Sequence, residues 1–154
     1  MRIHSEFLDA LPSDVLNLIE KGHAKDEAAK GVYCGYKKFA IILRAHDGSF
    51  IGALQAYTAF AEIYIDDIWV SPDYRCRGLG RKMLTLLEKR FQNKGYNNIN
   101  LVTSDFQAPD FYKRCGYAVE FVRVNQQNPH LTKTFFVKYF DDDKQFQGLL
   151  EKGS

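Results

Sequence analysis

Apolar residues near the start of the chain recur at the spacing of one helix face. Within residues 11–31 the positions that set this pattern are Val15, Leu16 and Ile19. This spacing is typical of an amphipathic α-helix. Ser13 is a suitable N-cap, and Gly22 or Gly31 would end the helix. The pattern also allows a short first strand over residues 2–7.

The period then changes to that of strands. Residues 36–45 (YKKFAIILRA) and 49–58 (SFIGALQAYT) are two β-rich runs, and Asp47-Gly48 between them is a good hairpin signal. Residues 62–70 (EIYIDDIWV) form a third run after a short connection. Three consecutive strands with short links are expected to be antiparallel neighbours.

A second amphipathic helix is predicted from Gly78 to Lys94, with Gly95 as its C-cap. Its apolar positions are Leu79, Met83, Leu86, Leu87 and Phe91. Residues 97–104 (NNINLVTS) follow as a buried strand. Because a helix crosses over between this strand and residues 62–70, the two strands should be parallel.

The last third of the chain predicts a short helix and a closing hairpin. Residues 107–117 (QAPDFYKRCGY) have a proline in the first helical turn and a glycine at the end. The hairpin pairs residues 117–124 with 132–140, and the acidic run at 141–143 should face solvent. The order α-β-β-β-α-β-α-β-β predicts one α/β (α+β) domain over residues 1–154. Its mixed, mostly antiparallel sheet would have one parallel pair at a central crossover and helices on both faces.

Composition narrows the class of protein. The 154 residues are 45% hydrophobic and 14% aromatic, which is typical of a packed globular chain. A net charge of +2 and a pI near 8.4 are too mild to indicate nucleic-acid binding. Cys34, Cys76 and Cys115 are odd in number and form no CxxC pair, so we expect free thiols and no metal. No leader-like or membrane-spanning apolar segment is apparent, which favours a cytoplasmic protein without a membrane partner.

Basic residues crowd the predicted start of the second helix. The stretch VSPDYRCRGLGRKML, residues 70–84, places Arg75, Arg77, Arg81 and Lys82 around two glycines. Each cation at a helix N-terminus costs a few tenths to about 1 kcal/mol because of the helix dipole. The cluster is therefore expected to surround a strongly negative ligand, and a phosphate group fits best.

Three phosphate-binding motifs compete for this stretch. A P-loop would need Gly-Lys-Ser/Thr, which the chain lacks. A dinucleotide fingerprint would need Gly or Ala at position 83, where this chain has Met. In its favour, Asp105 lies about 25 residues beyond Gly80, near the position at which that motif has an acidic residue that binds ribose. The third motif, Arg75-x-x-Gly78-x-Gly80, exposes helix N–H groups beside guanidinium groups and suits a pyrophosphate.

Together with two later segments, this stretch resembles the GNAT superfamily of acyl-CoA-dependent N-acyltransferases. The segments are residues 70–91, INLVTS and APDFYKRCGY, and the resemblance runs from Glu62 to Tyr117. It implies acetyl-CoA as co-substrate and an amine acceptor. At Asp105 the family often has Asn, so this cofactor contact would be weakened. The cofactor-binding residues implied are Ile68, Trp69, Val70, Arg75, Cys76, Arg77, Gly78, Leu79, Gly80, Arg81, Asp105 and Tyr112.

Thioester aminolysis needs a base for the amine and an acid for the leaving thiolate. Asp66 and Asp67 stand inside an apolar strand, and alternation sends them to opposite faces. The resemblance favours Asp66 as base, through water, with Asp67 second and Glu62 third. The alternative is that both aspartates are structural. Tyr112 is implied as the acid, the alternative being core packing beside its neighbour.

The function expected is acetyl transfer to a primary amine by direct attack in a ternary complex. A non-catalytic acyl-CoA-binding module and a nucleotide-binding module are the alternatives. An acyl-enzyme on Cys76 or Cys115 is disfavoured because neither has a histidine nearby in sequence. The acceptor stays open between small amines, aminoglycosides, polyamines, amino acids and protein amines, and a homodimer is also left open.

Overall fold

The structure, a computed structural model, describes residues 1–140. Its residues up to Cys34 form one compact unit, and a second unit begins at Gly35. The predicted first strand is wrong, because residues 1–8 have no regular secondary structure. The acidic run at 141–143 lies outside the described residues. That residues 1–154 form one domain stays a prediction.

The first unit contains helix α1, Ser13–Lys30. Pro12 is its N-cap, so Ser13 is already the first helical residue. Gly31 ends the helix in the left-handed conformation, at φ 66°. Its N–H bonds to Ala28 O at 3.2 Å, and the N–H of the next residue bonds to Glu27 O at 3.0 Å. This pair of bonds is a Schellman motif, which satisfies carbonyl groups that the helix itself leaves free.

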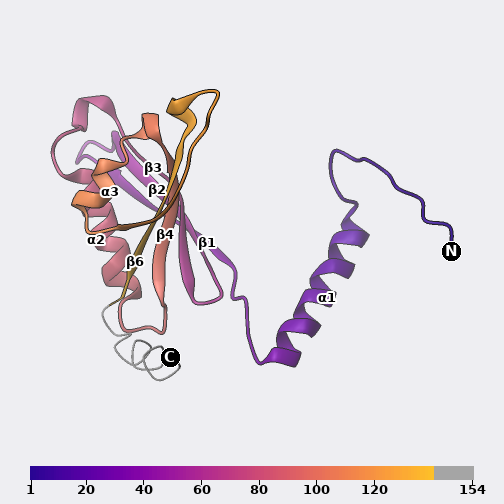
Figure 1. The fold of residues 1–154 in the computed structure, drawn as a ribbon. Coiled ribbons are helices and arrows are strands. Elements are labelled where there is room, and N and C mark those ends of the chain that lie inside the picture. The colour runs from indigo at the N-terminus through magenta and orange to yellow at the C-terminus, as the bar shows by residue number, and fades with distance from the viewer. Residues whose placement is uncertain (141–154) are drawn as a thin grey trace, which may run out of the picture. The chain divides into compact units, whose positions relative to one another are not determined.

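The second unit is built on a six-stranded sheet in the order β1-β2-β3-β4-β6-β5 (Figure 1). The strands are β1 Lys37–Arg44, β2 Phe50–Ala59, β3 Glu62–Val70, β4 Asn98–Ser104, β5 Ala118–Arg123 and β6 Lys133–Tyr139. All neighbours are antiparallel except β3 and β4, which are parallel. The predicted mixed sheet with one parallel pair at a crossover is therefore confirmed.

Tight turns join the first three strands. Between β1 and β2, Asp47 accepts a hydrogen bond from the Ser49 N–H at 2.9 Å, and Gly48 has a positive φ of 85°. Between β2 and β3, Phe60 and Ala61 both have positive φ, at 49° and 61°. Two consecutive left-handed residues are typical of a type I′ hairpin turn, whose twist matches that of the strands.

Helix α2, Leu79–Phe91, crosses from β3 to β4 and covers the sheet. Four of its residues are buried, namely Met83, Leu84, Leu87 and Phe91, whereas Leu86 is exposed. The helix ends at Gln92 rather than at the predicted Gly95, because Gln92 leaves the helical conformation at ψ 139°. Gly95 instead occupies the following turn with φ 82°.

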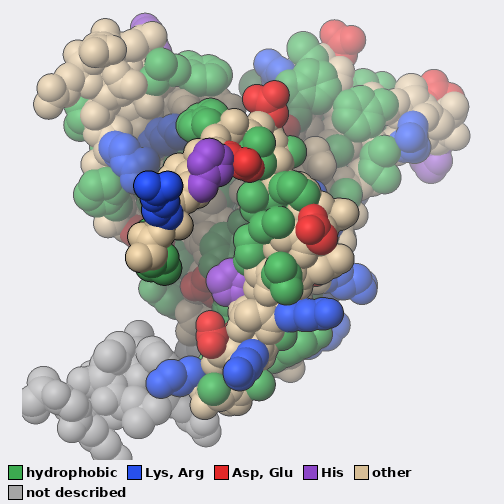
Figure 2. All heavy atoms as spheres, turned by 90° about the vertical axis from the view of Figure 1, so that its right-hand side faces the viewer, with side chains coloured by type: hydrophobic (Ala, Val, Ile, Leu, Met, Phe, Trp, Pro, Cys, Tyr) green, Lys and Arg blue, Asp and Glu red, His purple; other side chains and the backbone are tan. Residues whose placement is uncertain are grey.

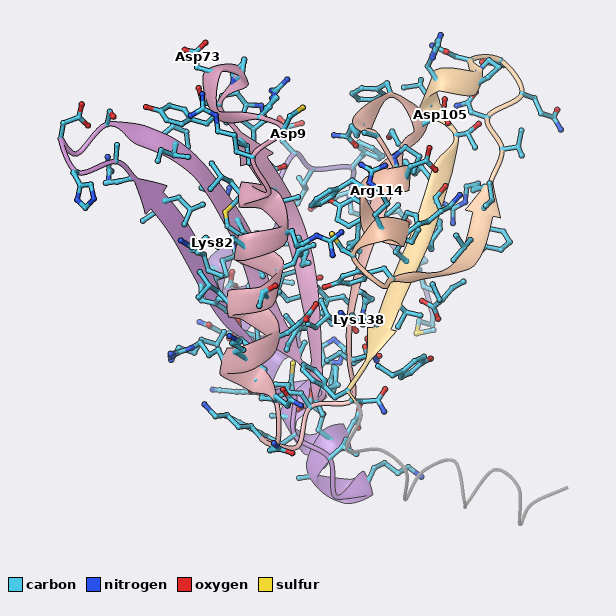
Figure 3. All side chains as sticks on the ribbon, turned by 90° about the vertical axis from the view of Figure 1, so that its left-hand side faces the viewer. Asp9, Asp73, Lys82, Asp105, Arg114 and Lys138 are labelled. Carbon is cyan, nitrogen blue, oxygen red and sulfur yellow. The ribbon has the colours of Figure 1, made fainter. Side chains whose placement is uncertain are left out.

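Helix α3, Asp110–Arg114, lies on the same face of the sheet as α2 (Figures 1 and 3). Residues of both helices belong to one core with the central strands, including Leu54, Ile63, Ile99 and Phe136. A helix on the opposite face stays a prediction. Three short 3-10 turns lie at Pro72–Tyr74, Asp105–Gln107 and Pro129–Leu131.

The surface carries many apolar side chains. Figure 2 shows hydrophobic groups interspersed with charged ones on the face that it draws. Among the exposed large apolar residues are Leu18, Phe106 and Phe121. No helix within residues 1–140 combines the length and apolar content that a membrane crossing needs.

Candidate active site

A β-bulge interrupts β3 where the two aspartates stand. Gln55 of β2 pairs with Asp67 and the next residue, Ala56, pairs with Ile65, which leaves Asp66 as the extra residue. Ile65 and Ile68 consequently both pack toward the core. The expectation that Asp66 and Asp67 point to opposite faces of the sheet is wrong. The extra residue of the bulge interrupts the alternation of side chains along the strand, and both aspartates line one small cavity.

This bulge cavity lies where β3 and β4 separate. The two strands pair at three positions, the last being Tyr64 with Asn100. Beyond them a cavity of about 60 Å³ lies between the strands. Its polar lining comes from Asp66, Asp67, Thr103, Gln107 and Tyr112, and its apolar lining from Ile65, Ile68, Leu101 and Val102.

A larger cleft of about 460 Å³ lies against the predicted phosphate turn. We call it the glycine-turn cleft. Its lining residues are Ile68, Val70, Tyr74, Arg75, Cys76, Gly78, Leu79, Gly80, Arg81, Gln107, Ala108, Phe111, Tyr112 and Arg114. Three of them, Ile68, Gln107 and Tyr112, also line the bulge cavity, so the two spaces meet there.

The glycine turn opens the first turn of α2 toward this cleft. Gly78 is the N-cap and adopts the left-handed conformation at φ 72°, which suits a residue without Cβ. The first helical bond runs from the Lys82 N–H to Gly78 O at 2.9 Å. The N–H groups of the residues before Lys82 have no acceptor within the helix. They can therefore bind an anion.

Arg75 and Arg81 bring cationic side chains to the cleft, which Arg114 also lines. Arg75 donates from Nε to the Val70 carbonyl at 2.9 Å, and its guanidinium lies 5.7 Å from the centre of the Trp69 ring. Arg81 donates from Nη2 to the Arg114 carbonyl at 2.8 Å. Each guanidinium keeps further N–H donors that these bonds do not use, and these can pair with phosphate oxygens.

Three residues of the expected cofactor set do not line the cleft. Trp69 is 47% exposed and stacks on Phe50, with ring centres 6.0 Å apart. Arg77 places its guanidinium 5.5 Å from the centre of the Tyr74 ring. Asp105 begins the 3-10 turn after β4, and its N–H bonds to a backbone carbonyl at 2.9 Å. Their cofactor contacts stay predictions.

Tyr112 stands at the junction of the two cavities and is 6% exposed. Its ring packs against Phe111 and Phe136, with centres 5.1 and 5.5 Å away. Burial raises the pKa of the Tyr112 hydroxyl well above its ordinary value, and the charge of Asp67 raises this pKa further. The hydroxyl is therefore protonated throughout the neutral range.

Glu62, the third candidate base, is held in a separate hydrogen-bonded group. The Tyr64 hydroxyl donates to one of its carboxylate oxygens, and Asn98 Nδ2 donates to the other at 2.8 Å. Glu62 lines neither the glycine-turn cleft nor the bulge cavity. Glu62 lies four residues before Asp66 on β3, so strand parity alone could not distinguish these two carboxylates.

Sequence reasoning missed several lining residues. These are Tyr74, Gln107, Ala108, Phe111 and Arg114 in the cleft and Thr103 in the bulge cavity. A signal for part of this set was present, because Ala108 and Phe111 belong to the segment APDFYKRCGY, which carries part of the family resemblance. Thr103 could not have been found without knowing where β3 and β4 part.

Comparison with known proteins matches this arrangement to one family. The model of the acetyltransferase (GNAT) family matches residues 8–117, which is more than half of the chain. The chain belongs to the GNAT acetyltransferase family. Among curated relatives, the blasticidin-S acetyltransferase of Streptomyces morookaense is 30% identical over 92 residues, which are 59% of this chain and 67% of the relative. The thialysine N-ε-acetyltransferase of Bos taurus is 36% identical over 56 residues, 35% of this chain and 33% of the relative.

Solved structures of GNAT proteins share the fold. An acetyltransferase from Bacillus cereus superposes with a TM-score of 0.72 at 23% identity, covering 88% of this chain and 98% of its own. A Bacillus anthracis protein assigned as a streptothricin acetyltransferase, solved with acetyl coenzyme A, gives a TM-score of 0.59 at 22% identity. That match covers 68% of this chain and 63% of the other.

Proposed function

We propose that this GNAT protein transfers the acetyl group of acetyl-CoA to a primary amine by direct attack within a ternary complex. The observation that carries the proposal is the meeting of the glycine-turn cleft and the bulge cavity at Ile68, Gln107 and Tyr112. A donor in the cleft would bring its thioester to this junction. An amine in the bulge cavity would approach the same point from the side of Asp66 and Asp67.

The donor's pyrophosphate would bind at the first turn of α2. Free N–H groups and the positive end of the helix dipole favour an anion there. Arg75 and Arg81 line the cleft and add charge-assisted hydrogen bonds. The backbone of β3 from Ile68 to Val70 follows the bulge, where N–H groups can pair with pantetheine and polarise the acyl carbonyl.

The acceptor must lose a proton before it attacks. An alkyl amine has a pKa near 10.4, so it is mostly charged at neutral pH. Asp66 and Asp67 line the same cavity, and either carboxylate can take the proton through a water molecule. The amine nitrogen then bonds to the carbonyl carbon and the carbon–sulfur bond breaks. The nitrogen loses a second proton to water, which gives an amide and the thiolate of CoA.

Tyr112 would supply a proton to that thiolate. A thiol has a pKa near 8.5, whereas burial holds the pKa of Tyr112 far above this value. Transfer of this proton alone would therefore be uphill at every stage. We expect Tyr112 to donate a hydrogen bond that strengthens as negative charge develops on sulfur, and to pass its proton on only as solvent returns one to the phenolate oxygen.

The names of the relatives suggest where to look for the acceptor. One is named for blasticidin-S and another for the ε-nitrogen of thialysine. A panel of amines that contains both compounds, with spermidine and an amino-acid amide, would be scanned for release of free CoA thiol. Release that depends on an amine supports the transferase. Donor binding without release for any amine would indicate a binding module instead.

Tyr112→Phe tests the chemistry at the junction. The variant keeps the ring packing and removes the hydroxyl, so kcat should fall by roughly 100- to 10,000-fold with little change in acetyl-CoA affinity. Tyr117→Phe is a matched control. It also removes a buried hydroxyl, but one that lines neither the glycine-turn cleft nor the bulge cavity, and activity should be unchanged. Full activity in Tyr112→Phe would refute the role of Tyr112.

Asp66→Asn and Asp67→Asn, made separately, test the base. The variant that removes the base should lower kcat by roughly 100-fold or more, whereas the other should leave kcat within a few-fold of wild type. If both variants retain the wild-type kcat, proton removal does not depend on either aspartate.

A further inference from the structure

Helix α3 is held at its C-terminal end by cations from two other elements. Arg81 of α2 donates to the carbonyl of Arg114, the last helical residue, at 2.8 Å. Lys138 of β6 donates from Nζ to the carbonyl of Cys115, the C-cap, at 3.1 Å. The last carbonyls of a helix lack partners within it and carry partial negative charge, so both contacts are favourable.

Lys138 is itself fixed in place. Its Nζ forms an ion pair with Glu88 Oε1 of α2 at 2.9 Å, and the two side chains are 33% and 25% exposed. It also lies 5.6 Å from the centre of the Tyr117 ring. Figure 3 shows Lys138 and Arg114 near the gap between α2 and α3. We call Arg81, Glu88 and Lys138 the α3 clamp.

The clamp matters because α3 cannot position itself. The helix has five residues, which is far below the length at which an isolated helix is stable in water. Its place depends on contacts with the rest of the fold. Tyr112 sits in the middle of this helix, and its hydroxyl must point to the junction of the two cavities if it is to reach sulfur.

We propose that the α3 clamp is a positioning device for Tyr112, an inference that rests on the general-acid role proposed above. Lys138 and Glu88 line neither the glycine-turn cleft nor the bulge cavity. Their loss therefore removes no contact with donor or acceptor. A displacement of about 1 Å in a catalytic group can cost roughly 100-fold in rate, so α3 need shift only slightly for turnover to fall.

Arg81 gives the clamp a second property. It contacts α3 and also lines the cleft where the donor phosphates would bind. Its bond to the Arg114 carbonyl uses Nη2, which leaves other guanidinium donors for phosphate. The same side chain thus joins the phosphate end of the donor to the helix that carries the acid.

The test replaces Lys138 by methionine together with Glu88→Gln, so that no carboxylate is left unpaired. We expect kcat to fall about 10- to 100-fold while the KM for acetyl-CoA stays within about twofold of wild type. Lys138→Arg keeps a cationic donor and should retain most activity. Lys113→Met is the matched control, since it removes an exposed lysine of α3 itself and should change neither constant.

A double-mutant cycle separates positioning from general stability. In a Tyr112→Phe background there is no hydroxyl to position, so the clamp variant should cause no further loss of kcat. A further loss by the same factor as in wild type would overturn the clamp proposal and leave the role of Tyr112 standing. Full activity of Tyr112→Phe alone would instead refute the general-acid role of Tyr112, and the clamp proposal would then fail with it. If the paired variant does not fold, Lys138→Gln alone provides the same cycle, because it removes the cation and keeps a polar side chain at that position.

Discussion

Replacing Gly80 by alanine tests how α3 packs against the first turn of α2. A Cβ at Gly80 would lie 2.9 Å from Cζ and 3.3 Å from Cε2 of the Phe111 ring. Carbon atoms pack best at about 3.5–4.0 Å, so the ring would have to move by roughly 0.6 Å or more. The ring of Phe111 packs against Tyr112, with centres 5.1 Å apart, so its displacement would disturb this contact.

The expected magnitude combines two opposing effects. Overpacking of this kind costs about 1–3 kcal/mol, whereas alanine in place of glycine favours a helix by up to about 1 kcal/mol. Gly80→Ala should therefore lower the free energy of unfolding by about 1 kcal/mol. In a Phe111→Leu background the shorter side chain leaves room for Cβ. The same substitution should there be neutral or raise the free energy of unfolding by up to about 1 kcal/mol.

Urea unfolding of the wild type, both single variants and the double variant measures this coupling. An interaction energy of about 1–2 kcal/mol between Gly80 and Phe111 is expected from these values, within the range for residues in direct contact. Acetyl-CoA affinity should also fall in Gly80→Ala, because Phe111 lines the cleft. If Gly80→Ala stabilises the protein equally in both backgrounds, the close approach of α2 and α3 does not exist in solution.

Three further results are expected. Because the pKa of Tyr112 is raised above its ordinary value of 10.0, the ratio of wild-type to Tyr112→Phe kcat should stay constant from pH 7 to about pH 10; a decline of that ratio below pH 9 would contradict the assignment. Cys76 is exposed and lines the cleft, whereas burial raises the pKa of the Cys115 thiol. Mass spectrometry should therefore find rapid alkylation of Cys76, slowed by acetyl-CoA, and little at Cys115; indifference of Cys76 to acetyl-CoA would place the donor elsewhere. Phe60→Asn combined with Ala61→Gly should raise the free energy of unfolding in urea by about 1 kcal/mol, since both positions have positive φ; unchanged stability would mean that this turn carries no strain.

The order and type of most elements could be predicted from local patterns. Strand runs, the crossover helix and the Asp47-Gly48 turn depend on side-chain period and turn chemistry, which are properties of short segments. Helix ends were less predictable. Gly95 is the better sequence signal for the end of α2, yet the helix ends at Gln92, whose ψ of 139° lies outside the helical range.

The candidate site was predictable where it depends on a contiguous motif. The glycine turn and Tyr112 belong to such motifs, and the structure brings both to one cleft. The bulge at Asp66 depends on the register between β2 and β3, which no single segment encodes. Phe111 and Thr103 line the two cavities only because α3 and β4 are placed by tertiary packing.

The short parallel pairing of β3 with β4 has a consequence for cooperativity. The two strands share three paired positions, whereas each belongs to a longer antiparallel ladder on its other side. The sheet is thus two half-sheets, β1-β2-β3 and β4-β6-β5, which meet along a weak seam. Amide hydrogen exchange should detect the halves as separate opening units in the free protein. A molecule that hydrogen-bonds along β3 and also contacts α3 would tie the halves together, so that they open as one.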